Sequence, residues 1–322
     1  MKLSDLKWLN DIFLKIDIEN LPHGIIISGS VGLGKKILAK EISSKLLINK
    51  NSNQEDVNLI ESNNHPDYFY LNNDKVLIHH ITFRKNKWDE EKGQRNVNDF
   101  LSMTPSVAKN KVAVIANAQT MNDESQNALL KSLEEPAQNT YIIMITDRPK
   151  SLLNTIYSRC QVINIPALNL SDLNDWLISK GITDVNATDF PSFSSPLKIL
   201  NDLENDRHLD FKEFINIISN FLSNKSDINS TLKLIISLDI NLIMKLNYLI
   251  EFLKIILKSK VLSENLSGVY KNFNNCNFNN LKISNLINEL NNLRYDYFRV
   301  PQINETHVLN YFLSEVRNSI KI

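Results

Sequence analysis

The stretch GSVGLGKKILAKE, residues 29–41, decides the fold of the first part of this chain. Gly29, Gly34 and Lys35 satisfy the first places of the pattern G-x-x-x-x-G-K-[S/T], which is typical of a phosphate-binding loop, or P-loop. An apolar run, GIIIS, precedes the loop and a segment with helical spacing follows it. In that context the backbone N–H groups around Gly29, Gly32 and Gly34 can surround phosphates at a helix N-terminus, with Lys35 reaching the outer ones. The sequence therefore predicts a P-loop α/β domain.

The last place of the pattern holds Lys36, where a serine or threonine hydroxyl would bind Mg²⁺. A second cation at this place would repel the metal. A P-loop ATPase also needs an acidic residue at the end of a neighbouring strand, but the candidate strand, residues 112–115, is followed by Ala116 and Asn117. Because two parts of the metal site are missing, the sequence predicts a degenerate site without magnesium. Binding of ATP or ADP without hydrolysis stays open.

The composition limits the classes of partner. The chain has 322 residues, enough for two or three domains, and its 36 basic and 36 acidic residues give a net charge of +0. It therefore has no global attraction to DNA or membranes. Its two cysteines, Cys160 and Cys276, predict neither a disulfide framework nor a four-cysteine zinc site and fit a reducing cytoplasm. The N-terminus does not resemble a signal peptide, and charged residues interrupt the apolar residues 242–257, which predicts an amphipathic helix.

The first half of the chain alternates apolar strands with helices. Strands are expected at residues 24–29, 111–118, 140–146 and 161–165. Asn122 is expected to cap a helix that Pro136 ends. Such alternation predicts a mostly parallel sheet covered on both faces.

After Pro166 the sequence predicts helices alone. Ser171 is expected to cap a small helix that ends before Gly181, and amphipathic helices follow from residue 208. The predicted division is an α/β domain over 1–165, a small helical lid domain over 166–207 and an all-α collar domain over 208–322.

The segment LLNTIYSRCQ, residues 152–161, closes the α/β domain. An arginine held in a turn after a helix can project outward and stabilise phosphate charge on an adjacent subunit, as an arginine finger. A surface arginine in a salt bridge is the simpler interpretation of an isolated S-R-C. The residues alone therefore favour a surface arginine in a salt bridge for Arg159.

Four segments, in this order, carry a family resemblance. They are LPHGIIISGSVGLGKK (21–36), NNHPDYFYL (63–71), residues 98–161 with NALLKSLEEP and SRC, and SSPLKIL (194–200). Together they resemble the bacterial DNA polymerase III clamp loader, a pentamer of the AAA+ class, and most of all its delta-prime subunits. The resemblance is specific over about residues 21–161, weaker to about residue 200 and only architectural beyond.

The resemblance implies a non-hydrolysing clamp-loader subunit, which is no enzyme by itself but a component of the DNA polymerase III holoenzyme. It implies that Arg159, held by Ser158 and Cys160, acts in trans on the ATP site of a neighbouring motor subunit. Thr146 and Lys198 stand at sensor-like positions. The implied partners are tau/gamma-like motor subunits and a delta-like subunit, with the sliding clamp and primed DNA contacted through the complex, and no membrane.

The chain departs from many relatives of this family in one respect. They carry a four-cysteine zinc module between the P-loop helix and the H-P-D turn, but residues 46–67 contain no cysteine, so no zinc is expected. His65, His79 and His80 lack further metal ligands and are expected in turns or strands. The charged run 87–95 is expected to form a solvated hairpin or loop.

Two alternatives belong to other classes. The first is a free-standing AAA+ ATPase, above all an ATP-hydrolysing motor subunit of the same or a related loader with an atypical metal site. It would need an unseen residue to repair at least one loss in that site. A P-loop kinase lacks both a substrate-binding lid and a catalytic carboxylate near the loop.

Overall fold

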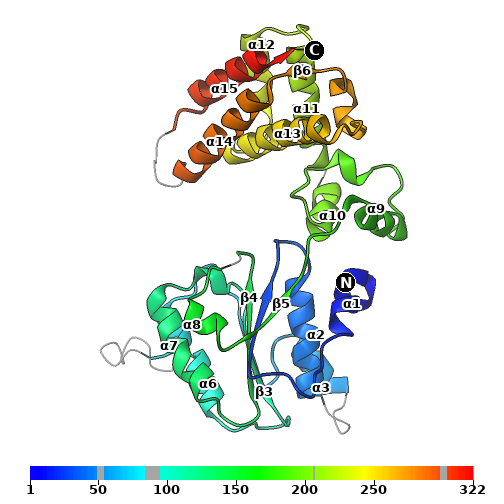
Figure 1. Ribbon diagram of the computed structural model, residues 1–322. Helices are drawn as coiled ribbons and strands as arrows, with labels where there is room; N and C mark the ends of the chain where they lie inside the picture. The colour runs from blue at the N-terminus through cyan, green and yellow to red at the C-terminus, as the bar shows by residue number, and fades with distance from the viewer. Residues whose placement is uncertain (49–53, 84–94, 149, 206, 298–302, 322) are drawn as a thin grey trace. The chain divides into compact units, whose positions relative to one another are not determined.

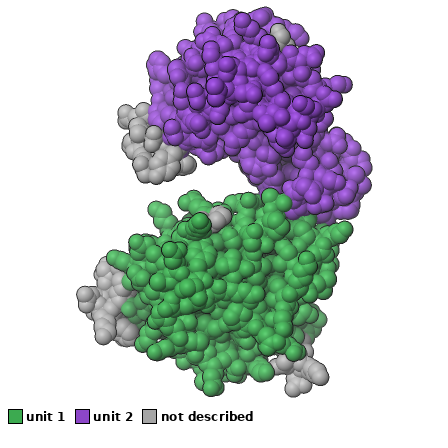
Figure 2. Space-filling view, viewed as in Figure 1, with its two compact units in different colours: residues 1–167 green, residues 168–322 purple. Residues whose placement is uncertain are grey.

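The structure is a computed structural model that describes residues 1–48, 54–83, 95–148, 150–205, 207–297 and 303–321. The chain forms two compact units, Met1–Ala167 and Leu168–Ile322, which Figure 2 shows in green and purple. The sequence predicted a first boundary after residue 165, and the boundary between the units follows residue 167. The second predicted boundary, after residue 207, falls inside the second unit.

The first unit is built on a five-stranded sheet in which all neighbouring strands are parallel. The strands lie in the order β2-β3-β4-β1-β5 (Figure 1). Their bounds are β1 Gly24–Ser28, β2 Tyr68–Leu71, β3 Lys111–Ile115, β4 Thr140–Thr146 and β5 Gln161–Asn164. Every residue of β1 and β3 is buried, as expected for a parallel sheet with both faces covered. The predicted α/β fold is confirmed.

Apolar runs predicted four of these strands and missed β2. This strand lies at an edge of the sheet, and its two middle residues are only half buried. Its apolar signal is therefore weaker than that of the central strands, although it pairs with β3 over its whole length.

Helices cover both faces of the sheet. Their bounds are α1 Lys7–Phe13, α2 Lys35–Leu47, α3 Gln54–Glu61, α4 Ile78–Ile81, α6 Val97–Ser102, α7 Asp123–Glu134 and α8 Asn154–Tyr157, with short 3₁₀ turns at Leu3–Asp5 and Ala118–Thr120. Helices α1, α2 and α3 lie on one side of the sheet, and α6, α7 and α8 lie on the other (Figure 1). Asn122 caps α7 as predicted, accepting from the N–H of Ser125 at 3.0 Å, and α7 ends before Pro136.

The second unit consists mainly of helices. They are α9 Leu170–Ser179, α10 Pro196–Glu204, α11 His208–Leu222, α12 Ile228–Ser237, α13 Leu242–Leu262, α14 Asn280–Asp296 and α15 Glu305–Ser319, with 3₁₀ turns at Ala187–Asp189 and Gly268–Phe273. Aliphatic and aromatic side chains from α11 to α15 form its core. Glu251 on α13 is buried in this unit and accepts from the N–H of Ser192 at 2.7 Å, which joins the segment before α10 to the larger bundle.

Two predictions for this part of the chain were wrong. Strands do not stop after Pro166, because β6 Asn277–Phe278 pairs antiparallel with β7 Ile320–Lys321. The N-cap of α9 is Asn169 rather than Ser171, since the Asn169 side chain accepts from the N–H of Asp172 at 2.7 Å. Asparagine and serine are similarly good caps, so the sequence alone did not decide between them.

The charged residues inside the apolar stretch of α13 are accommodated by partners. Lys245 is buried, and its Nζ lies 2.8 Å from Oε1 of Glu305 on α15. Among the described residues, no helix has both the length and the apolar character needed to cross a membrane.

Candidate functional site

The predicted P-loop connects β1 to α2, and the N-terminal segment packs on it. Gly34 precedes α2 with φ of 87°, and a Cβ there would lie 2.6 Å from Cδ1 of Leu9. Glycine is therefore required both by the left-handed backbone and by the close approach of Leu9. The indole Nε1 of Trp8 donates to the carbonyl of Leu33 at 3.0 Å. The loop thus has the backbone expected of the motif and is supported from α1.

Lys35 is bound to the loop itself. Its Nζ donates to the carbonyl oxygens of Gly29 and Ser30, both at 2.7 Å, and the residue is buried. Burial lowers the pKa of Lys35, while the nearby carboxylate of Asp147 opposes that shift. The ammonium would have to give up carbonyl contacts to bind a phosphate.

Lys36 points to another oxygen of the chain. Its Nζ donates to Oδ1 of Asn72 at 2.8 Å, and Asn72 directly follows β2. At the end of β3, Ala116 is buried and its N–H donates to the carbonyl of Leu71 at 2.8 Å. The amide of Asn117 donates to the carbonyl of Asn73 at 3.0 Å. The position after β3 therefore carries an amide where an ATPase needs a carboxylate.

The sensor-like Thr146 is the last residue of β4 and is buried. Its hydroxyl is 2.9 Å from Oγ of Ser151, donates to the carbonyl of Arg148 at 3.0 Å and accepts from the N–H of Arg148 at 3.1 Å. The hydroxyl is thus engaged in the turn that follows its own strand. Lys198 belongs to the second unit, on α10, where its Nζ lies 5.3 Å from the ring centroid of Phe193.

Asp147 is a residue of this loop region that the sequence motifs did not indicate. It follows Thr146 directly, and its charge acts on Lys35. Its Oδ1 is buried, lies 4.0 Å from Nε of Arg148, and has no hydrogen-bond partner among the described residues. The only signal in the sequence was an acidic residue at the end of a buried strand. Taking the described part of the chain as a whole, no group of three or more His, Cys, Asp or Glu side chains could hold a metal ion.

Arg159 lies in the turn between α8 and β5, as its segment predicted. The neighbouring Cys160 packs against the start of β1, where a Cβ on Gly24 would lie 2.7 Å from Sγ. Burial raises the pKa of the Cys160 thiol to about 11, so it stays protonated near neutral pH. Cys160 therefore fixes the turn by packing.

The guanidinium of Arg159 is held by three contacts within its own unit. Nη1 donates to the carbonyl of Thr155 at 2.8 Å and to Oγ of Ser158 at 3.2 Å. Nη2 lies 2.8 Å from Oε1 of Glu134, the last residue of α7. The side chain of Arg159 remains 35% exposed. The salt bridge that an isolated S-R-C favours is present, and the arginine is still accessible from solvent.

The P-loop and Arg159 lie at opposite ends of the sheet. Strands β1 and β5 are parallel, with Ile25 beside Gln161 and Ser28 beside Asn164, so Arg159 is level with residue 23. Gly29 lies beyond the other end of β1. Since strand residues rise about 3.3 Å each, the levels of residues 23 and 29 are separated by about 20 Å.

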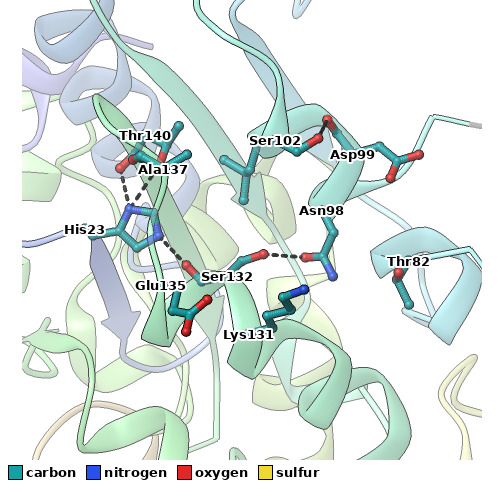
Figure 3. Close-up of a pocket in the computed structure, with 11 residues that line it drawn as sticks. His23, Thr82, Asn98, Asp99, Ser102, Lys131, Ser132, Glu135, Ala137 and Thr140 are labelled. Atoms are coloured by element: carbon teal, nitrogen blue, oxygen red, sulfur yellow. Dashed lines mark hydrogen bonds between the residues drawn. The ribbon is translucent and has the colours of Figure 1, made fainter.

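A pocket of about 450 Å³ opens at the same end of the sheet as Arg159 (Figure 3). His23 contacts the carbonyl oxygen of Thr140 through Nδ1 and that of Ser132 through Nε2, the latter at 2.9 Å. The hydroxyl of Ser132 donates to Oδ1 of Asn98 at 2.9 Å. These groups bind one another across α6, α7 and β4, and so they hold this end of the sheet together.

The remaining predicted residues are placed as follows. His65 lies in the turn before β2, where Nδ1 accepts from the N–H of Asp67 at 3.1 Å. His79 and His80 lie in helix α4, so their predicted place in a turn or strand was wrong. The short segment forms a helical turn in which Nδ1 of His80 accepts from the N–H of Leu77 at 3.0 Å. Of the charged run 87–95, all but Arg95 lies outside the described residues.

The first half of the chain is similar to known proteins of one family. The family model described as DNA polymerase III, delta subunit, matches residues 7–169. The chain is 29% identical over 170 residues to the DNA polymerase III subunit delta′ of Haemophilus influenzae, covering 50% of this chain and 48% of that protein. It is 30% identical over 161 residues to the same subunit of Pseudomonas aeruginosa, covering 48% of this chain and 46% of that protein. The match thus spans about half the length of these curated relatives.

Among solved structures, a DNA polymerase III gamma subunit-related protein from Thermotoga maritima is similar to the chain. It has a TM-score of 0.48 and 15% identity, covering 97% of this chain and 99% of that one. The clamp loader delta protein of Bacillus subtilis has a TM-score of 0.36 and 11% identity, covering 96% and 99%.

Proposed function

This chain belongs to the family of DNA polymerase III delta-prime subunits, and on that premise we propose that it serves a clamp loader without hydrolysing ATP itself. In this proposal Arg159 is presented to the ATP site of a neighbouring subunit, where it stabilises the charge that develops on the transferred phosphate.

One observation carries the proposal: Arg159 and the P-loop stand at opposite ends of the same sheet. They are separated by about 20 Å along β1, a span that no side chain crosses. If Arg159 acts on a nucleotide, that nucleotide must be bound by another subunit. Its partial exposure leaves the guanidinium accessible to such a partner.

The geometry of the P-loop supports the second half of the proposal. Lys35 is bound to two carbonyl oxygens of the loop, and Lys36 stands in place of the hydroxyl that would bind Mg²⁺. Asn117, at the end of β3, cannot act as the carboxylate that holds the metal. A loop of this kind can keep its shape as part of a rigid subunit without carrying out hydrolysis.

The proposed partners are ATP-hydrolysing subunits of the tau/gamma type and a delta-like subunit, assembled through the helices of the second unit. The sliding clamp and primed DNA would be contacted through the complex. The neutral net charge agrees with limited DNA contact by this chain alone, because it provides no global attraction to DNA phosphates.

A second candidate is an ATP-hydrolysing motor subunit, and Asp147 favours it. This carboxylate follows β4, acts electrostatically on Lys35 and has a buried oxygen without a hydrogen-bond partner among the described residues. In that reading Asp147 would replace the missing acidic residue after β3.

The test is ATP turnover by the reconstituted complex of this chain, motor subunits, delta-like subunit, clamp and primed DNA. Wild type is compared with Arg159→Ala and with Arg148→Ala, which removes the same charge from an exposed position at the P-loop end of the sheet. ATP hydrolysis is also measured for the isolated chain, without its partners.

We expect the isolated chain to be inactive and Arg159→Ala to remove most turnover at the site it serves, since arginine fingers contribute about 10³–10⁵ in rate. Arg148→Ala should assemble and behave as wild type. Hydrolysis by the isolated chain, abolished by Asp147→Asn, would establish the motor alternative instead.

A further inference from the structure

We propose that Glu134 is a positioning residue for Arg159, an inference that rests on the proposed function of Arg159. Its carboxylate holds the guanidinium in place before a neighbouring subunit arrives. Glu134 is not among the residues that the sequence motifs indicated as functional.

The contacts of Arg159 come from two different helices. Glu134 on α7 binds Nη2 at 2.8 Å, while Thr155 on α8 and Ser158 beside it bind Nη1. Within the part of the chain that the structure describes, these contacts leave Nε without a hydrogen-bond partner. A planar guanidinium fixed at two nitrogens can therefore still donate to an oxygen of a bound phosphate.

The two helices that hold Arg159 are themselves joined. Oε1 of the buried Gln126 on α7 accepts from the N–H of Leu153, which precedes α8, at 2.7 Å. Nε2 of the same side chain donates to the carbonyl of Met121 at 3.0 Å. Buried Leu133 of α7 and Ile156 of α8 belong to one apolar core. Glu134 and the turn of Arg159 thus stand on a common rigid frame.

The place of Glu134 in its helix also calls for an explanation. It is the last residue of α7, and Glu135 is the C-cap. A helix C-terminus carries partial negative charge, so two carboxylates there are electrostatically unfavourable. Arg159 offsets this cost for Glu134. In the described part of the chain Glu135 makes no hydrogen bond or ion pair with Arg159, which makes it a matched control for charge at this helix end.

A positioned arginine is expected to raise the rate more than the affinity for ATP. The neighbouring subunit binds ATP by its own loop, whereas the guanidinium is needed where charge develops during phosphoryl transfer. Loss of Glu134 should therefore lower kcat and leave KM unchanged. A residue that only stabilised α7 would change the unfolding temperature without this effect on kcat.

The experiment measures kcat and KM for ATP in the reconstituted complex with clamp and primed DNA. The variants are Glu134→Ala, Glu134→Gln, Glu135→Gln and Arg159→Ala, together with the double variant that combines Glu134→Ala with Arg159→Ala. Assembly and the thermal unfolding midpoint are recorded for each variant. Glu134→Gln keeps a side chain of the same length with one oxygen that can accept a hydrogen bond. It provides the values of kcat and KM if Glu134→Ala does not assemble.

We expect Glu134→Ala to lower kcat about fivefold, the upper end for an exposed ion pair, and Glu134→Gln to lower it less. Glu135→Gln should equal wild type, and Glu134→Ala should add nothing in the Arg159→Ala background. An unchanged kcat for Glu134→Ala overturns the inference, and so does a raised kcat, which would make the contact an inhibitory latch. If Arg159→Ala itself has no effect, the proposed function fails, and that result is distinct from a failure of Glu134 alone.

Discussion

At the carboxyl end of the parallel sheet, the two lysines of the P-loop are bound to oxygens of their own chain. At the opposite end Arg159 is also held by its own chain, but its side chain remains 35% exposed. Lys35 contacts two loop carbonyls and Lys36 contacts Asn72. Arg159 is held by Glu134 and by two oxygens of α8 and its following turn, and it keeps a free edge. The same sheet thus presents a buried lysine, Lys35, bound to loop carbonyls at one end, and at the other end an arginine that is held by its own chain and remains partly exposed.

The difference between the two ends shows that the conformation of a P-loop and its ability to hydrolyse a nucleotide depend on different residues. Gly34 and the packing of Leu9 keep the loop in its conformation, while Lys36 and Asn117 stand at the places where the proposed function has metal-binding groups missing. In the proposed function, the loop remains a structural joint between β1 and α2 and hydrolyses no ATP. The functional cation of this chain is then expected at the other end of the sheet.

The difference between the two ends of the sheet is tested most directly by replacing one cationic residue at each end. In the reconstituted complex, Arg159→Lys should lower turnover about 10²-fold at the site it serves, because a lysine cannot reproduce the planar fork of the guanidinium. Lys35→Met, which removes a cation from the P-loop, should leave turnover of the complex unchanged. ATP hydrolysis by matched amounts of assembled complex is the measurement.

Assembly must be verified for both variants by size-exclusion chromatography, since a subunit that fails to join would also lower turnover. A large loss with Lys35→Met in an assembled complex would mean that the loop of this chain is active. The assignment of the two ends would then be reversed.

The Arg159 end of the sheet is also predicted to be the more strongly anchored end. Asp67, which is buried before β2, accepts from the N–H groups of Ser106, Val107 and Ala108 at 2.7–2.8 Å. Asp67→Asn should lower the free energy of unfolding by about 3 kcal/mol, because three buried N–H donors would lose the charged oxygens that accept their hydrogen bonds. Asp74→Asn, an exposed change beyond the other end of β2, should have little effect in the same urea titration.

The contribution of Asp67 should depend on pH. Burial alone would raise its pKa, but the N–H donors of residues 106–108 and the charge of Lys111 lower it below the ordinary value. With a lowered folded pKa, the stabilisation is complete above the unfolded value of about 3.9 and is lost as pH falls through the folded value. Unfolding curves between neutral pH and pH 3 should show this loss in wild type, and a smaller loss in Asp67→Asn.

Much of this fold could be predicted from the sequence because its signals are local. Buried runs such as those of β1 and β3 are continuous and apolar, and Asn122 with Pro136 marks the limits of α7. The P-loop is equally local, since its residues are consecutive. The S-R-C turn could be located for the same reason.

The contacts that give the site its character join distant parts of the chain, and no spacing reveals them. Glu134 meets Arg159 only because α7 and α8 pack together, and the charge of Asp147 acts on Lys35 only because β4 pairs with β1. The short pair β6 and β7 was missed for the same reason, since two residues near position 278 pair with two at the C-terminal end. Two segments so far apart in the sequence can pair only when the helices between them are folded.

A smaller effect is expected from a change in the shape of the P-loop. Gly34→Ala places a Cβ 2.6 Å from Leu9 at a residue with φ of 87°, so it should lower the free energy of unfolding by about 1–2 kcal/mol. ATP turnover of the assembled complex should remain at the wild-type value. Chemical denaturation and turnover measured on the same preparations test both statements. A loss of turnover with normal assembly would show that the loop has more than a structural role.

The smallest effect is expected from an attempt to repair the P-loop. Lys36→Thr restores the hydroxyl of the motif and gives up the contact between Lys36 and Asn72, which is exposed and therefore contributes little to stability. The isolated variant should still not hydrolyse ATP, because Asn117 leaves the metal without a carboxylate after β3 and Lys35 remains bound to loop carbonyls. Adding Asn117→Asp supplies that carboxylate. If the single change alone produced hydrolysis, Asp147 would be the group that completes the site, and the P-loop end of the sheet would be one substitution away from activity.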